Sequence, residues 1–256
     1  MQTLRSVDEI RPITFGTDAR DVAVGAYERL LTLLQGLEPD DWSARTECPA
    51  WDVADMVGHL IGAARANASF RETIRQQLWA RRHRRAFDGN DLDAMNALQV
   101  QEHADLGPSE RIAALRAMAP KAVEHRMRFP RPLRRIRVPL AQTGSTADGM
   151  PTSLQLGQLM AVIYTRDVWL HRIDIARATG RPLELDELDG RVVEDVVAEW
   201  AARHGQPFRL TLSGPAGGGF RQGDGGPSLE LDAVEFCRTL SGRAPSDGLL
   251  ATCVLF

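Results

Sequence analysis

Apolar residues recur every three or four positions over the first two thirds of the chain, a period typical of amphipathic helices. Residues 17–37 show this period most clearly. Their apolar stripe consists of Val22, Ala26, Leu30, Leu33 and Leu34. Gly36 and Pro39 then interrupt the pattern, so we expect a helix that ends just before them.

A second helix is expected to begin after Asp52, whose carboxylate suits an N-cap, and to run through His59 and Phe70 as far as Trp79. Residues 91–103 and 108–127 predict either one interrupted helix or two separate ones, with Ser109 able to cap the second. A further long helix is expected from Thr152 or Ser153 to Thr179, because Gly180 and Pro182 follow.

Residues 129–150 lack a clear period and are predicted to form an irregular loop that includes a short strand. A connection of more than about 12 residues is unusual, so the sequence suggests a cover over a functional site. The basic run 81–85 has two interpretations, a solvated helix end or an anion-binding patch.

After Leu188 the pattern changes to a mixture of helix and strand. We expect a helix over 191–204, a strand over 208–213, a glycine-rich hairpin-type turn over 214–226, a returning strand over 228–231, and a last helix capped by Asp232. The sequence therefore predicts an α+β protein with a helical domain over residues 1–186 and a small α+β domain over residues 187–256.

Composition indicates an ordinary globular protein, with 43% hydrophobic and 25% charged residues. A net charge of −3 gives no general footprint for nucleic acid. No apolar stretch is long enough to span a membrane, and residues 1–10 do not resemble a signal peptide. Three cysteines, none in a metal-ligand spacing, favour a reducing compartment, so we expect a cytoplasmic protein.

Three polar residues interrupt apolar helix faces and suggest a metal site. Asp167 and His171 are four apart and share a helix face, and His59 lies between apolar neighbours on the earlier helix. Two imidazoles and one carboxylate leave a coordination position open, as in catalytic zinc sites. The alternative is that these residues form a helix-stabilising pair and a core hydrogen bond.

Three segments carry a resemblance to a known family. They are residues 41–60, with CPAW followed by HL, residues 167–180, DVWLHRIDIARATG, and residues 231–243, LDAVEFCRTLSGR. In this order they resemble the mycothiol-dependent maleylpyruvate isomerases of the DinB-like superfamily, whose members are metal-binding four-helix bundles. The resemblance implies His59, Asp167 and His171 as ligands of zinc or another divalent metal. Asp167 departs from the glutamate that is usual in the family, and Ala50 from its glycine.

The resemblance also implies a mechanism. Mycothiol, a low-molecular-weight thiol, would act as the nucleophile toward a small electrophile, with the metal lowering the thiol pKa. The family's C-terminal arginine matches Arg243 or Arg238 and would act in catalysis. Isomerase and transferase chemistry both fit this scheme, in a monomer or a homodimer. A metal-dependent hydrolase of thiol conjugates and a non-catalytic member of the fold are the alternatives.

Four further residues have two interpretations each. Asp174 would either orient a metal ligand or pair with arginine at the helix surface. Cys48 would be either a nucleophile before a helix N-terminus or part of a structural loop. Trp42 and Trp51 would be either packing anchors of that loop or stacking groups for a substrate.

Overall fold

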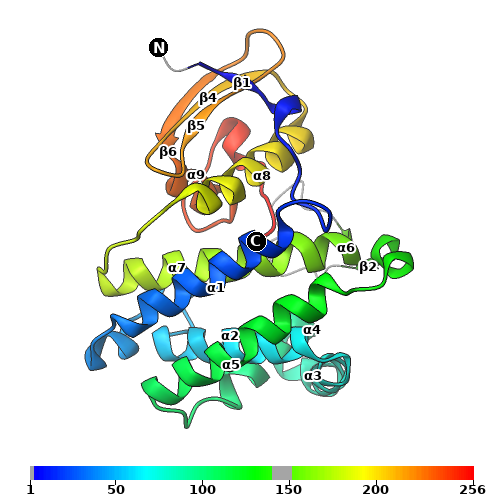
Figure 1. The fold of residues 1–256 in the computed structure, drawn as a ribbon, viewed down its shortest axis with the longest axis vertical. Helices are drawn as coiled ribbons and strands as arrows, with labels where there is room; N and C mark the ends of the chain where they lie inside the picture. The colour runs from blue at the N-terminus through cyan, green and yellow to red at the C-terminus, as the bar shows by residue number, and fades with distance from the viewer. Residues whose placement is uncertain (1–2, 140–151) are drawn as a thin grey trace. The chain divides into compact units, whose positions relative to one another are not determined.

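The computed structural model describes residues 3–139 and 152–256 (Figure 1). These residues form two compact units. One unit comprises residues 23–139 and 152–183 and is almost entirely helical, whereas the other comprises residues 3–22 and 184–256 and combines helices with a sheet. The structure thus has the predicted α+β class. The predicted domain limits, 1–186 and 187–256, stay a prediction.

Four helices share the apolar core of the helical unit. They are α1 (Ala19–Gln35), α2 (Val53–Ala68), α5 (Pro108–Met127) and α7 (Tyr164–Thr179). Each contributes residues at the predicted three-and-four spacing, for example Leu30 and Leu34 from α1, and Leu60 from α2, all fully buried. Pro108 begins α5 after Gly107, so the expected cap at Ser109 is wrong by two residues.

The expected helix from Asp52 to Trp79 is two helices. Asp52 caps α2 as predicted, but the chain turns at Ser69, whose φ of −153° is extended. Ser69 then accepts a hydrogen bond from the backbone N–H of Glu72 and caps a new helix. This is α3 (Phe70–His83), and it packs with α4 (Asp91–Gln101) against α2. The helices α4 and α5 are separate, so residues 91–103 and 108–127 form two helices rather than one interrupted helix.

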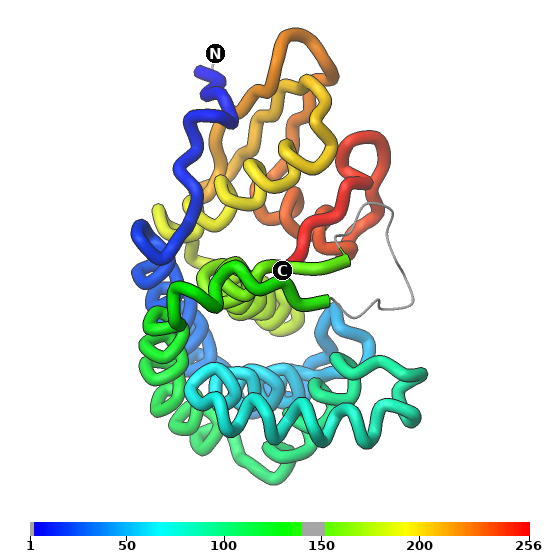
Figure 2. The backbone as a smooth tube through the Cα atoms, turned by 90° about the vertical axis from the view of Figure 1, so that its right-hand side faces the viewer, coloured from blue at the N-terminus to red at the C-terminus, as the bar shows by residue number. Residues whose placement is uncertain are grey.

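The expected helix start at Thr152 or Ser153 is wrong, because this segment forms a strand. The strands β2 (Arg137–Pro139) and β3 (Ser153–Gln155) pair antiparallel and lie side by side in Figure 2. The helical turn α6 (Leu156–Gln158) and the π-helical η5 (Leu159–Ile163) then lead into α7. The predicted loop over 129–150 begins with η4 (Arg131–Arg135), and its part beyond residue 139 lies outside the described residues.

The α+β unit is built on a four-stranded sheet of order β1-β5-β4-β6. Its elements are β1 (Arg5–Ser6), α8 (Glu187–His204), β4 (Phe208–Ser213), β5 (Gly218–Gln222), β6 (Ser228–Asp232) and α9 (Ala233–Leu240). The glycine-rich stretch contains β5, antiparallel to β4, so its prediction as a turn alone is wrong. The strand β6 runs parallel to β4 rather than returning beside it as a hairpin would.

Gly226 shows why the connection to β6 needs glycine. Its φ is +76°, and a Cβ at this position would lie only 1.9 Å from the carbonyl oxygen of Pro207. The chain can therefore pass this close to the start of β4 only without a side chain.

An aromatic cluster forms the core of the α+β unit. The ring of Trp200 meets Phe208 edge-on at 4.6 Å and Phe236 at 5.3 Å between centroids. All three side chains are fully buried, and the indole N–H of Trp200 donates to the carbonyl of Leu249 at 2.9 Å. Among the described residues no helix is long and apolar enough to cross a membrane.

Candidate metal centre

Two helices of the helical unit bring the three predicted ligands together. His59 lies in the middle of α2, and Asp167 and His171 lie one turn apart on α7. Each residue offers one ligand atom, and these atoms all lie within 4.8 Å of one another. The structure therefore places side by side residues that are more than 100 positions apart in the chain.

The distances between these atoms suit a single small cation. Nε2 of His171 lies 3.4 Å from Oδ1 of Asp167, and Nε2 of His59 lies 3.7 Å from Oδ2. Zinc bonds to nitrogen and oxygen measure about 2.1 Å, so two tetrahedral ligands stand about 3.4 Å apart. The side chains of both histidines keep only 8% exposure while the Asp167 side chain keeps 26%, which leaves one side accessible.

Asp174 fixes the orientation of His171. Its Oδ2 accepts a hydrogen bond from Nδ1 of His171 at 2.9 Å, and its side chain is fully buried. The proton on Nδ1 leaves the lone pair on Nε2, the nitrogen that faces Asp167. Asp174 is fully buried and so does not lie at the helix surface, and its contact with His171 agrees with the interpretation that it orients this candidate ligand.

The electrostatics of the cluster favour a cation. Burial alone would raise the pKa of Asp167, but the imidazoles of His171 and His59 hold that pKa well below its ordinary value. Burial likewise opposes a charge on His171, yet Asp167 and Asp174 raise the pKa of His171 to about 9. The two carboxylates thus create a buried negative field at the point where the ligand atoms converge.

The loop before α2 supplies two further neighbours. The ring of Trp51 stacks on His59, with 5.0 Å between centroids, and lies 6.0 Å from His171. It packs on the candidate ligands themselves, whereas Trp42 is buried in the core. The half-buried Cys48 lies within 4.8 Å of ligand atoms of His171 and Asp174.

Arg126 and two tyrosines complete the surroundings of Asp167, and the sequence alone did not indicate them as site residues. Arg126 is fully buried on α5, and its guanidinium carbon lies 6.0 Å from the centre of the Tyr164 ring. Burial raises the pKa of Tyr27, and that of Tyr164 to about 12, and both hydroxyls feel the charges of Arg126 and Asp167. One signal was present: Arg126 continues the apolar stripe of Ala119, Ala122 and Val123.

The two C-terminal arginines belong to the α+β unit. Arg238 is buried on α9 and forms an ion pair with Glu235 one turn earlier. The backbone N–H of Arg243 donates to the carbonyl of Arg238 at 2.9 Å, just after the helix ends. Their assignment as catalytic residues stays a prediction.

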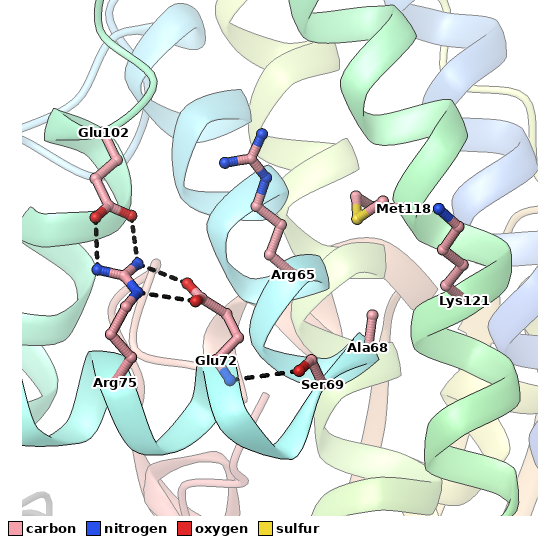
Figure 3. Close-up of a pocket in the computed structure, with 8 residues that line it drawn as sticks. All are labelled: Arg65, Ala68, Ser69, Glu72, Arg75, Glu102, Met118 and Lys121. Carbon is pink, nitrogen blue, oxygen red and sulfur yellow. Dashed lines mark hydrogen bonds and ion pairs between the residues drawn. The ribbon is translucent and has the colours of Figure 1, made fainter.

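A separate hollow on the helical unit contains none of the three candidate ligands (Figure 3). Arg75 lies between Glu72 and Glu102 and binds both carboxylates with distances of 2.6 to 2.8 Å. Arg65 and Lys121 stand on the other side of Glu72 in the figure. Since one guanidinium already holds both acids, this hollow offers no metal-ligand set.

Comparisons with known proteins agree with the motifs. A family model described as "Mycothiol maleylpyruvate isomerase N-terminal domain" matches residues 25–176, more than half of the chain. A crystal structure of the mycothiol-dependent maleylpyruvate isomerase is similar over 96% of this chain and 94% of its own, with a TM-score of 0.55 and 14% identity.

A histidine-to-alanine mutant of that enzyme gives a TM-score of 0.54 and 13% identity, over 94% of this chain and 93% of its own. No curated protein sequence matches the chain. At this identity the solved structures establish the fold alone, and the family match carries the classification. The chain belongs to the mycothiol maleylpyruvate isomerase N-terminal domain family, which confirms the family and the enzyme class that the three motifs predicted.

Proposed function

We propose that this protein is a metal-dependent enzyme that uses mycothiol to isomerise, or to transfer the thiol to, a small electrophile. The observation that carries the proposal is the convergence of His59, Asp167 and His171 within 4.8 Å, with Asp174 holding the ring of His171. The family's name supports the thiol, since its members are described as mycothiol-dependent isomerases.

In this proposal the three side chains hold a divalent ion, for which zinc fits the mixed nitrogen and oxygen donors. Such an ion, when bound, lowers the pKa of a thiol that coordinates it and so supplies a thiolate near neutral pH. Asp167 contributes the negative charge, and Asp174 keeps the proton of His171 on Nδ1. Trp51 covers the ring of His59 and limits the access of water to it.

The first experiment measures metal content. We expect about one equivalent of zinc in the purified protein and less than about 0.1 equivalent in His59→Ala, because two ligands hold zinc far more weakly than three. His125→Ala is the matched control, since His125 is exposed, contacts the carbonyl of Asn67 and is not one of the candidate ligands. A wild-type protein that stays free of metal after incubation with zinc would contradict the proposal.

The second experiment identifies the reaction. The zinc-loaded protein is incubated with mycothiol and maleylpyruvate, and the products are followed by NMR and mass spectrometry. An isomerase returns the thiol and leaves the mass of the substrate unchanged, whereas a transferase consumes one thiol for each product. Cleavage of a mycothiol conjugate would instead indicate the hydrolase, and no turnover with a panel of electrophiles would indicate a non-catalytic member.

A further inference from the structure

Two donor atoms of the Arg126 side chain have no hydrogen-bond partner in the described part of the chain. Its side chain is fully buried near the end of α5, and Nη1 donates to Oγ1 of Thr165 at 3.3 Å. Nε and Nη2 are buried and have no hydrogen-bond partner within residues 3–139 and 152–256. Buried donors on a charged group are costly when they are left unpaired, so this arrangement needs a physical reason.

The two unused donors are the pair that recognises a carboxylate. Nε–H and Nη2–H point in parallel from one edge of the planar guanidinium and match the two oxygens of a carboxylate. The rest of the group is held in place, since Thr165 binds Nη1 and the ring of Tyr164 lies 6.0 Å from the guanidinium carbon. One edge of a fixed fork is therefore left for a ligand.

This fork belongs to the surroundings of the candidate metal centre. Burial lowers the pKa of Arg126, and the charge of Asp167 acts in the opposite direction, so the two groups are electrostatic neighbours. No ion pair joins them in the described part of the chain, however. If Asp167 shares its charge with a divalent ion, the guanidinium lacks a counter-charge of its own. The cluster then carries an excess of positive charge that an anionic ligand would neutralise.

The exposure of residues along α7 indicates from which side a ligand would approach Arg126. Thr165, Arg166 and Val168 are buried, whereas Tyr164 and Asp167 are half-buried. These two residues are the neighbours of the guanidinium and of the candidate metal position. The half-buried side of Tyr164 and Asp167 is therefore the side from which a ligand would reach the guanidinium and the candidate metal position.

From this arrangement we infer that Arg126 is a substrate-binding residue, and that the Nε and Nη2 edge of its guanidinium binds a carboxylate of the substrate. The inference rests on the proposed function and narrows it: the electrophile is a carboxylic acid, bound with its carboxylate against α5 and its reactive carbon toward the His59–Asp167–His171 centre. The neutral hydroxyls of Tyr27 and Tyr164 flank the same position.

The test is calorimetric titration of the zinc-loaded protein with maleate, a simple dicarboxylate, and with its uncharged diamide. We expect maleate to bind and the diamide to bind at least tenfold more weakly, since hydrogen bonds to charged groups are the stronger ones. Arg126→Met should weaken maleate binding at least tenfold. Arg128→Met is the matched control, because Arg128 is exposed on the same segment and pairs with Glu124.

Zinc content and the melting temperature of the metal-free protein are recorded for each variant. Replacing an unpaired buried charge by a methionine of similar length is expected to keep or raise the melting temperature. If Arg126 has a purely structural role, Arg126→Met should lower the melting temperature and leave maleate binding unchanged. That result would overturn the inference. Zinc content separates this failure from a failure of the proposed function, which would appear as a wild-type protein without zinc.

Arg126→Lys keeps the positive charge but loses the two parallel donors of the guanidinium. This variant tests the inference if Arg126→Met does not fold. Full maleate affinity in the lysine variant would show that the fork is not needed, and a loss of tenfold or more would support it. A zinc-loaded wild-type protein that fails to bind maleate at millimolar concentration would also overturn the inference.

Discussion

The two compact units bury different kinds of residues at their centres. The helical unit encloses charged and polar groups, among them His59, Arg126, His171 and Asp174, each at least 94% buried. The α+β unit also buries some charged groups, Arg238 among them, but its core closes around the rings of Trp200 and Phe236. Polar burial is costly and apolar burial is stabilising. We therefore expect changes in the first centre to alter ligand binding and changes in the second to alter stability.

The largest effect on metal binding is expected from Asp167→Asn, which replaces the charged oxygen donor by a neutral amide of the same shape. Zinc affinity should fall by at least about 100-fold, because a neutral amide is a much poorer ligand than a carboxylate. The metal-free protein should lose only the stabilisation that the carboxylate gains at neutral pH from the two imidazoles, which its lowered pKa reflects. Metal analysis and thermal melting check the two parts, with the exposed Asp105→Asn as control. Retained zinc together with a large loss of stability would show that Asp167 serves the stability of the helical unit rather than ligand binding.

Trp200→Ala tests the other unit. Truncating a fully buried tryptophan typically costs about 3–5 kcal/mol, and here the hydrogen bond to Leu249 is lost as well. Urea unfolding followed by circular dichroism measures the change, and Trp200→Phe should cost less because it keeps a ring against Phe208. Zinc content per folded molecule should stay at its wild-type value. A variant that is as stable as the wild type would show that the aromatic cluster contributes little.

Local patterns explain why much of the fold follows from the sequence. Periodicity places α1 and α5, and the caps Asp52 and Asp232 act where the sequence predicts them. The pair Asp167 and His171 is also local, since four residues make one turn of α7. His59 is different, because only the packing of α2 against α7 brings it to that pair. Its apolar helix neighbours suggested a place in the site, and the family resemblance implied it as a ligand, but no spacing joins it to the pair.

The missed features depend on contacts between distant residues. The strand β5 contains Gly218 and Gly219, which favour turns in isolation, and it forms because β4 and β1 pair on either side of it. Ser69 interrupts a helix between two segments that both favour helix, so only its extended φ reveals the break. The unused donors of Arg126 likewise become visible only when every neighbour is known.

Asp174→Asn is expected to have an intermediate effect, a moderate loss of zinc affinity in the helical unit. Asparagine can still accept the hydrogen bond from Nδ1 of His171 but carries no charge. Partners of metal-bound histidines typically contribute 10- to 100-fold in metal affinity, so we expect zinc binding to weaken within that range. Competition with a chelator of known affinity measures it. An unchanged affinity would mean that orientation of the ring, rather than the charge behind it, is what Asp174 supplies.

The smallest effect is expected from Asp232→Ala, which removes a helix cap in the α+β unit. The carboxylate of Asp232 accepts hydrogen bonds from the backbone N–H groups of Val234 at 2.8 Å and Glu235 at 3.2 Å. Losing such a cap costs about 1 kcal/mol, measurable by urea unfolding. Asp247 is a matched control, since it precedes η6 (Gly248–Ala251) without a side-chain cap, and Asp247→Ala should leave stability unchanged. Neither variant should alter zinc content, because stability in this unit comes from packing and caps rather than from a ligand. A loss of zinc in Asp232→Ala alone would show that the two centres are coupled, and the contrast between them would then fail.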